Sequence, residues 1–130
     1  MKKSALPVGI KLSEVPRKKF RSQLEADFAN HLEYHKSMGT ISLWLHEPFK
    51  VRLAEGVWFL PDFFVLRDNC LPAFYEVKGE YSRRLGEVKF KTAAEHNDWA
   101  DWFWVTRRAD GAWEIKCYQA GKALPKKKKH

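Results

Sequence analysis

The sequence has few cysteines and no long apolar stretch, and both shortages limit what the chain can be. Its two cysteines, Cys70 and Cys117, stand far apart without the Cys-x-x-Cys spacing of a zinc site, and unpaired thiols suit a reducing cytoplasm. No apolar run approaches the roughly 18 residues of a membrane-spanning helix. A secretory signal requires an apolar region after its charged start, and no such region follows Met1-Lys2-Lys3. We therefore expect a cytoplasmic protein without a membrane partner.

The chain is rich in aromatic side chains and in positive charge. Its 130 residues, 45% hydrophobic and 15% aromatic, are typical of one globular domain that buries a substantial core. Lysine and arginine number 24 against 16 aspartates and glutamates, which gives a formal net charge of +8. An excess of this size favours a polyanionic partner, and nucleic acid is the first candidate.

Composition divides the chain into an arm, a domain and a tail. Residues 1–19 are polar and basic without periodicity, and predict an N-terminal arm that is either merely solvated or ordered on phosphates. Residues 20–120 hold the periodic apolar runs of the domain. Residues 121–130 end in a run of lysines, which predicts a tail that adds salt-sensitive DNA affinity without sequence preference.

Two aromatic, β-branched runs in the middle of the chain each carry a carboxylate where a strand should be apolar. They are Phe59–Val65 and Phe74–Gly79. A buried carboxylate is costly unless it is paired or binds a cation. Side chains two residues apart share a face of a strand, so Glu76 and Lys78 point the same way, and hairpin pairing brings Asp62 to the same point. Two hard oxygen ligands suit a divalent cation such as Mg²⁺.

A helix is expected before these strands, and one of its glutamates allows two interpretations. Ser22 followed by Glu25 matches a capping box and predicts a helix from Ser22 to about Ser37. Glu25 also lies on one helical stripe with Phe28 and Leu32, at the end of the apolar face that packs on the sheet. A site role as third carboxylate is favoured over a purely capping role, because two carboxylates are expected nearby.

The remaining runs complete an α/β or α+β fold with a mixed central sheet of about four to five strands flanked by helices. Pro61 inside a strand pattern marks an edge or a bulge. The aromatic run after the second helix favours a buried strand over a base-stacking platform. The expected elements are a hairpin over Phe49–Leu66, a helix over Leu85–His96, a strand over Trp99–Val105, an Asp110-Gly111 turn and a return strand over Trp113–Tyr118.

The motifs Pro61-Asp62 and Glu76-Val77-Lys78, in this order and followed by Gly79, resemble those of the PD-(D/E)XK nuclease superfamily. The resemblance spans residues 20–110 and is strongest to small phage endonucleases, including the phage Holliday junction resolvases of the endonuclease I type. Those share a Ser-x-x-Glu helix, an aromatic-x-Pro-Asp-Phe strand and an acidic-x-Lys-Gly strand end. The spacing from Asp62 to Glu76 is longer here. The resemblance implies a restriction-endonuclease-like core.

The resemblance also implies a role for each site residue. Asp62, Glu76 and the Val77 carbonyl would hold Mg²⁺, with Mn²⁺ able to substitute, and Glu25 would hold a second ion or its waters. Lys78 would orient the attacking water and stabilise developing negative charge. Either Lys89 or Lys91, on the second helix, would assist at the site. The basic residues expected to contact phosphates are Lys18, Lys19, Arg21, Arg83, Arg84, Lys89, Lys91, Arg107 and Arg108.

These expectations describe a magnesium-dependent DNA endonuclease of phage or mobile-element type, acting in recombination and in the host cytoplasm if phage-encoded. Branched DNA such as Holliday junctions or flaps, and simple duplex nicking, both remain open as substrates. So short a chain has no separate reading module, which favours recognition of DNA shape. Junction resolution would need two active sites, hence a homodimer. A non-catalytic DNA-binding or assembly protein on the same fold, and an RNA-directed nuclease, are the alternatives.

Overall fold

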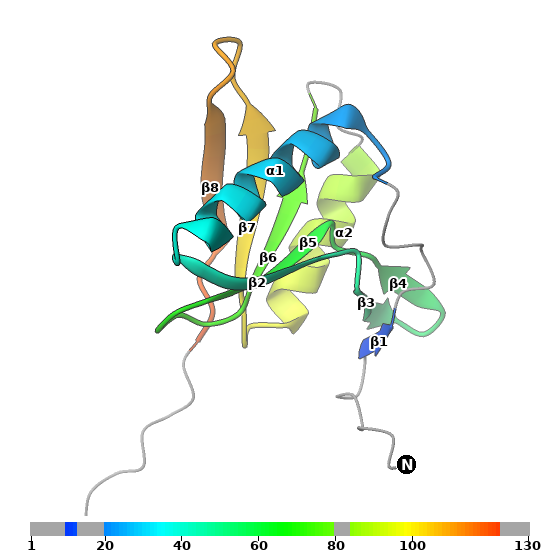
Figure 1. The fold of residues 1–130 in the computed structure, drawn as a ribbon. Helices are drawn as coiled ribbons and strands as arrows, with labels where there is room; N and C mark the ends of the chain where they lie inside the picture. The colour runs from blue at the N-terminus through cyan, green and yellow to red at the C-terminus, as the bar shows by residue number, and fades with distance from the viewer. Residues whose placement is uncertain (1–9, 13–19, 80–83, 123–130) are drawn as a thin grey trace, which may run out of the picture.

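A mixed five-stranded sheet, the main sheet, forms the centre of the structure (Figure 1). The computed structural model describes residues 10–12, 20–79 and 84–122. Helix α1 (Gln23–Ser37) lies in front of the main sheet in Figure 1, and α2 (Arg84–His96) lies behind it. The strands, in spatial order, are β2 (Ile41–His46), β5 (Phe63–Arg67), β6 (Ala73–Val77), β7 (Asp101–Arg107) and β8 (Trp113–Gln119). The expected α+β class and mixed sheet are confirmed.

The pairing of β6 with β7 is parallel, whereas its pairing with β5 is antiparallel. Parallel neighbours need a crossover connection, and α2 supplies it between β6 and β7. The β5–β6 hairpin aligns Phe63 with Tyr75, which sets the residues just before β5 against the end of β6. On the other side, the β6–β7 register places Glu76 beside Trp104.

A second, small sheet of three strands corrects one prediction about the middle of the chain. Its strands are β1 (Ile10–Leu12), β3 (Phe49–Ala54) and β4 (Val57–Phe59), so part of the expected arm pairs with β3. The hairpin predicted over Phe49–Leu66 is wrong beyond Phe59, because the chain then changes sheets and β5 pairs with β2. Pro61 lies in this connection, where its missing N–H and fixed φ suit a strand break.

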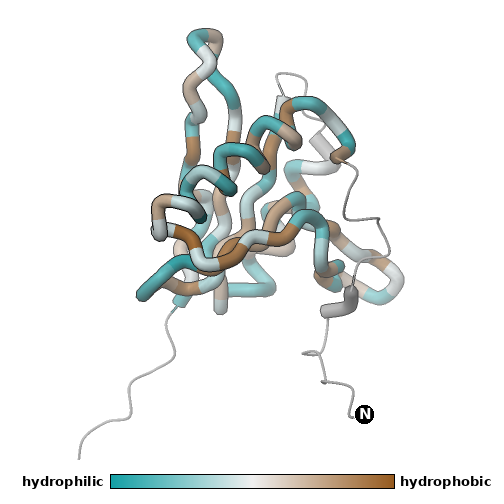
Figure 2. The backbone as a smooth tube through the Cα atoms, viewed as in Figure 1, coloured by the Kyte–Doolittle hydropathy of each residue, from teal (hydrophilic) through white to brown (hydrophobic). Residues whose placement is uncertain are grey.

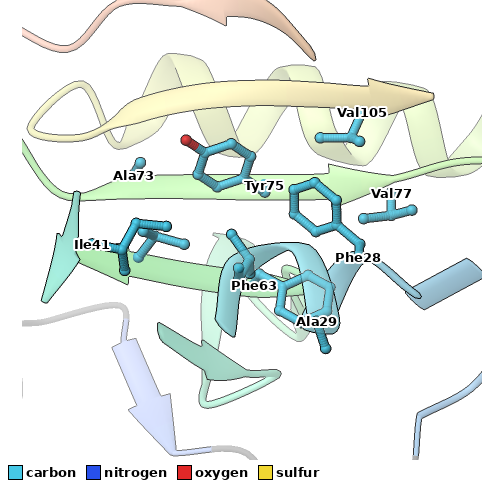
Figure 3. Packing of buried hydrophobic residues seen from close by; sticks show 10 residues of the cluster. Phe28, Ala29, Ile41, Phe63, Ala73, Tyr75, Val77 and Val105 are labelled. Carbon is cyan, nitrogen blue, oxygen red and sulfur yellow. The ribbon is translucent and has the colours of Figure 1, made fainter. Parts of the chain in front are cut away.

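Each face of the main sheet has its own core. Towards α1 lie Phe28, Phe63, Tyr75, Val77 and Val105 (Figure 3), and towards α2 lie Phe64, Phe74, Phe90, Trp102 and the half-buried Trp104. Adjacent residues along β5 and β6 fall on opposite faces, as strand geometry requires. Figure 2 shows hydrophobic and hydrophilic segments alternating along α1, the pattern of a helix with one face on a sheet.

The helices agree with the sequence to within a residue at their starts. Ser22 caps α1, since its Oγ accepts a hydrogen bond from the Glu25 N–H at 3.2 Å. The aromatic strand begins two residues later than expected, so Trp99 precedes β7 and is 39% exposed, whereas Trp102 is fully buried. No helix among the described residues is long and apolar enough to span a lipid bilayer.

Replacing Trp102 by alanine should reduce the free energy of unfolding by about 3–5 kcal/mol, the range for truncating a buried large aromatic residue. Its ring stacks on Phe74 at 4.4 Å between centroids and meets Phe90 edge-on at 5.8 Å. Trp99→Ala is the matched control and should cost much less, because that ring is partly exposed. Urea denaturation measures both, and equal losses would contradict the assignment of Trp102 to the core.

Candidate active site

The structure brings Asp62 and Glu76 together from neighbouring strands, as the sequence predicts. Asp62 directly precedes β5 and Glu76 lies in β6, and the two residues are 8% and 3% exposed. The Val77 N–H donates to Asp62 Oδ2 at 2.8 Å, and the Asp62 N–H donates to Glu76 Oε1 at 3.0 Å. Each carboxylate is thus held by a backbone amide of the neighbouring segment.

The negative charge of the Asp62–Glu76 pair is poorly compensated by the surrounding residues. Burial raises the pKa of Asp62 well above its ordinary value, and the nearby charges of Glu76 and then Glu25 raise it further. Burial also raises the pKa of Glu76, although Lys78 opposes that shift. Two buried acids whose pKa values are both raised indicate a place where a bound cation would relieve an electrostatic cost.

Lys78 connects the buried pair to solvent. Its Nζ lies 3.2 Å from Glu76 Oε2, and its side chain is 24% exposed whereas that of Glu76 is only 4% exposed. The Lys78 N–H donates to the Val105 carbonyl at 2.8 Å, which fixes the backbone to β7. Gly86 at the start of α2 lies against the amine. A lysine in this position can present a proton donor to a ligand while it neutralises part of the acid pair.

Glu25 approaches the same place from α1. It is buried, and its charge raises the pKa of Asp62. Its backbone N–H is capped by Ser22, but its carboxylate does not complete the predicted capping box, because Oε2 accepts from the Arg21 N–H at 3.4 Å instead of from Ser22. The helix start therefore has a cap at Ser22 and a buried carboxylate whose charge acts on Asp62.

Two further buried polar residues, His46 and Glu47, complete the site and were missed by sequence reasoning. His46 Nε2 lies 3.0 Å from Glu25 Oε2 and 3.2 Å from Glu47 Oε1. Arg21 Nε donates to Glu47 Oε1 at 2.8 Å. Among the described residues, His46 Nδ1 and Glu47 Oε2 are buried and have no hydrogen-bond partner. The available signal was a polar pair that ends the apolar run of β2, directly before Pro48.

The backbone of Glu47 is held in an unusual conformation beside the acid pair. Its φ is +47°, in the left-handed region that a non-glycine residue rarely adopts and that costs about 1–3 kcal/mol. The Glu47 N–H donates to the Asp62 carbonyl at 2.8 Å. This bond and the contacts of the Glu47 side chain maintain the conformation, so the His46-Glu47 and Pro61-Asp62 segments are fixed to each other.

The site offers two sets of metal donors. Asp62 and Glu76 supply only carboxylate oxygens, which suit Mg²⁺ or Mn²⁺. Glu25, His46 and Glu47 each offer a donor atom, all within 4.8 Å of one another, and the imidazole among them suits zinc or another transition metal. The raised pKa values of the first set and the unpartnered atoms of the second both fit a cation.

Those basic residues expected to contact DNA that the structure describes are dispersed along the chain. Lys18, Lys19 and Arg83 lie outside the described residues, and Arg84 is the first residue of α2. Arg21 lies at the site, where Glu47 is its ion-pair partner.

Most of the other expected DNA contacts lie in exposed ion pairs, and Lys89 is half-buried on α2. The pairs are Arg107–Asp27 at 2.7 Å, Arg108–Asp110 at 3.5 Å and Lys91–Glu87 at 3.7 Å. Exposed pairs of this kind contribute little energy, so a phosphate can replace the carboxylate partner at small cost.

Asp62→Asn should stabilise the metal-free protein at neutral pH and have no such effect in acid. The native-state pKa of Asp62 is raised. Its contribution to the free energy of unfolding is therefore fully present below the unfolded-state pKa of 3.8 and is lost as pH rises through the native-state pKa. The asparagine oxygen still accepts from Val77. Urea denaturation in EDTA at acidic and neutral pH measures the difference. Asp68→Asn, in the exposed turn after β5, is the control, and a loss of stability in Asp62→Asn at neutral pH would refute the electrostatic account.

No model of a known protein family matches the chain, and neither curated proteins nor solved structures give a match. The contacts of Asp62, Glu76, Lys78 and Glu25 are therefore the basis for assigning a function.

Proposed function

We propose that this protein is a metal-dependent DNA endonuclease with a PD-(D/E)XK active site on a restriction-endonuclease-like core. The observation that carries the proposal is the buried Asp62–Glu76 pair, held by reciprocal backbone hydrogen bonds and linked to solvent by Lys78. Buried acids whose pKa values are raised by burial and by a neighbouring charge are characteristic of catalytic sites. The formal charge of +8 favours a polyanionic substrate.

The order of elements supports the same proposal. A helix carrying Glu25 precedes an antiparallel β5–β6 hairpin, and a crossover through α2 leads to the parallel strand β7. The acids lie on the α2 face of the main sheet, because Glu76 shares its register and face with Trp104. Lys78 lies on the same face, against Gly86 and Trp104.

Asp62, Glu76 and the Val77 carbonyl would hold Mg²⁺ or Mn²⁺, and Glu25 would help to hold a second ion. The chemistry that a divalent ion supplies at such a site is neutralisation of charge on the phosphoryl oxygens and activation of water. The carboxylates fit this role because they are hard oxygen ligands and their negative charge is poorly compensated by the chain itself.

The side chains of the chain perform the remaining tasks. Lys78 donates a hydrogen bond to the attacking water or to a phosphoryl oxygen and stabilises the negative charge that develops there. Glu76 keeps the lysine amine in place at 3.2 Å. His46 and Arg21 position Glu25 and Glu47 around the acid pair, so that the carboxylates do not have to reorganise during the reaction.

Branched DNA is the substrate that we favour over intact duplex, and a cytoplasmic homodimer is part of the proposal because resolution of a junction needs two cuts. A non-catalytic DNA-binding protein and an RNA-directed nuclease are the competing functions. The first alternative would bind DNA without cutting a strand, and the second would cut RNA instead of DNA.

Incubation with supercoiled plasmid, linear duplex, a four-way junction or RNA, in Mg²⁺ or EDTA, tests the proposal. We expect metal-dependent cleavage of DNA that is lost in Asp62→Asn and falls at least about a hundredfold in Lys78→Ala. Lys36→Ala, an exposed lysine on α1, is the control and should cut normally. Tight DNA binding without cleavage in any metal would support the non-catalytic alternative, and cleavage confined to RNA would support the other.

Thermal denaturation with added metal tests the two donor sets separately. Mg²⁺ should raise the Tm of the wild-type chain, because an ion that binds only the native state stabilises it. The increase should vanish in Glu76→Gln and persist in His46→Gln if Asp62 and Glu76 hold the ion. The opposite pattern would assign the ion to Glu25, His46 and Glu47 and contradict the proposed metal ligands. Asp68→Asn is the control.

A further inference from the structure

A pocket of about 380 Å³ opens on the same face of the main sheet as Glu76. Phe90 and Lys91 line it from α2, Trp104 from β7, and Lys116 and Tyr118 from β8. Tyr118 is 41% exposed and meets Phe90 edge-on at 5.3 Å between centroids. The pocket is therefore an aromatic recess with amines at its rim, open to solvent.

The strand registers place this recess directly beside the acid pair. Glu76 is the neighbour of Trp104 across β6 and β7, and Trp104 is the neighbour of Lys116 across β7 and β8. Neighbouring strands are about 4.8 Å apart, so the indole lies one strand from the carboxylate and the lysine lies two strands away. Lys78 also reaches the indole, with Nζ 6.0 Å from the ring centroid.

The charges around the recess suit phosphates on either side of an aromatic ligand. Lys78 lies towards the acid pair, Lys116 is exposed on β8, and Lys91 Nζ lies 6.0 Å from the Tyr118 ring. Glu87 also lines the recess and pairs with Lys91 at 3.7 Å, but both side chains are 47% exposed. An exposed pair of this kind is weak, so it leaves Lys91 free to exchange its partner for a phosphate.

Aromatic rings between lysines are the chemistry that recognises unpaired nucleotides. A base stacks on an aromatic side chain whatever its sequence, and the amines follow the backbone. A base inside an intact duplex is already stacked on both sides and cannot enter a recess without being extruded at a cost in energy. A flat duplex surface would leave the rings of Trp104 and Tyr118 unused.

We propose that this recess binds an unstacked nucleobase next to the phosphate that is cut, so that the substrate is DNA with an unpaired nucleotide at the cleavage point. The inference rests on the proposed nuclease function, because it takes the neighbouring Asp62–Glu76 pair to be the place where the phosphodiester is cut. It narrows the substrate class to forks, flaps and other branched structures that present a single-stranded nucleotide there.

Binding of the full-length chain to a forked DNA and to a blunt duplex of the same length, in EDTA, tests the inference. Fluorescence anisotropy should show that Tyr118→Ala weakens fork binding about 5- to 150-fold, the range for loss of one base–aromatic stack, and leaves duplex binding unchanged. Tyr118→Phe should retain fork binding, because it keeps the ring. Tyr34→Ala, an exposed tyrosine on α1, is the matched control.

A 2-aminopurine base at the fork gives a second readout that is specific for stacking. Its fluorescence should be quenched by the wild-type chain and by Tyr34→Ala, and much less by Tyr118→Ala. Lys116→Ala should weaken fork binding more than Lys36→Ala does. Equal weakening of fork and duplex, or unchanged quenching in Tyr118→Ala, would overturn the inference. Because these measurements need no cleavage, they can fail while the plasmid assay succeeds, or succeed while it fails.

Discussion

The reciprocal hydrogen bonds between Asp62 and the end of β6 are the interaction on which the rest of the site depends. Backbone pairing between β5 and β6 runs from Val65–Ala73 to Phe63–Tyr75. Beyond that point, side-chain carboxylates accept from the amides of Asp62 and Val77. The carboxylates thus extend the hairpin past the last paired strand residues and are fixed by it. The same two bonds hold the Asp62 and Glu76 carboxylates in place.

Several features of the site lower the stability of the fold. Two acids are buried close together, Glu47 has a positive φ, and two buried atoms of the His46-Glu47 segment have no hydrogen-bond partner in the part of the chain that the structure describes. Strain, raised pKa values and unsatisfied groups concentrated in one place are characteristic of functional sites. In the main sheet, the apolar residues of β5 and β6 are divided between the α1 and α2 faces.

The parts of the site that follow from strand and helix periodicity could be predicted from the sequence. Glu76 and Lys78 are two residues apart on one strand, and Glu25 lies on the apolar stripe of a helix, so their directions were implied by spacing alone. His46 and Glu47 lie where β2 ends and the backbone leaves regular geometry, so no periodic pattern indicated their direction. The change of sheets at Pro61 was also hidden, because a proline shows that a strand is interrupted but not where the chain goes next. The aromatic strand was predicted to be core, and Trp102 agrees, but Trp104 also lines a pocket together with residues of α2 and β8.

The outer edge of β8 has a consequence for how the protein behaves in concentrated solution. Among the described residues, β8 pairs with β7 on one side only and is exposed along most of its length. An unpaired edge invites strands of other molecules, and charged side chains, lysine above all, discourage that contact. Glu114 and Lys116 stand in the middle of this edge. Lys116, which lines the recess that we propose binds a base, is therefore also placed to discourage strand pairing, and its removal is expected to lower solubility as well as affinity.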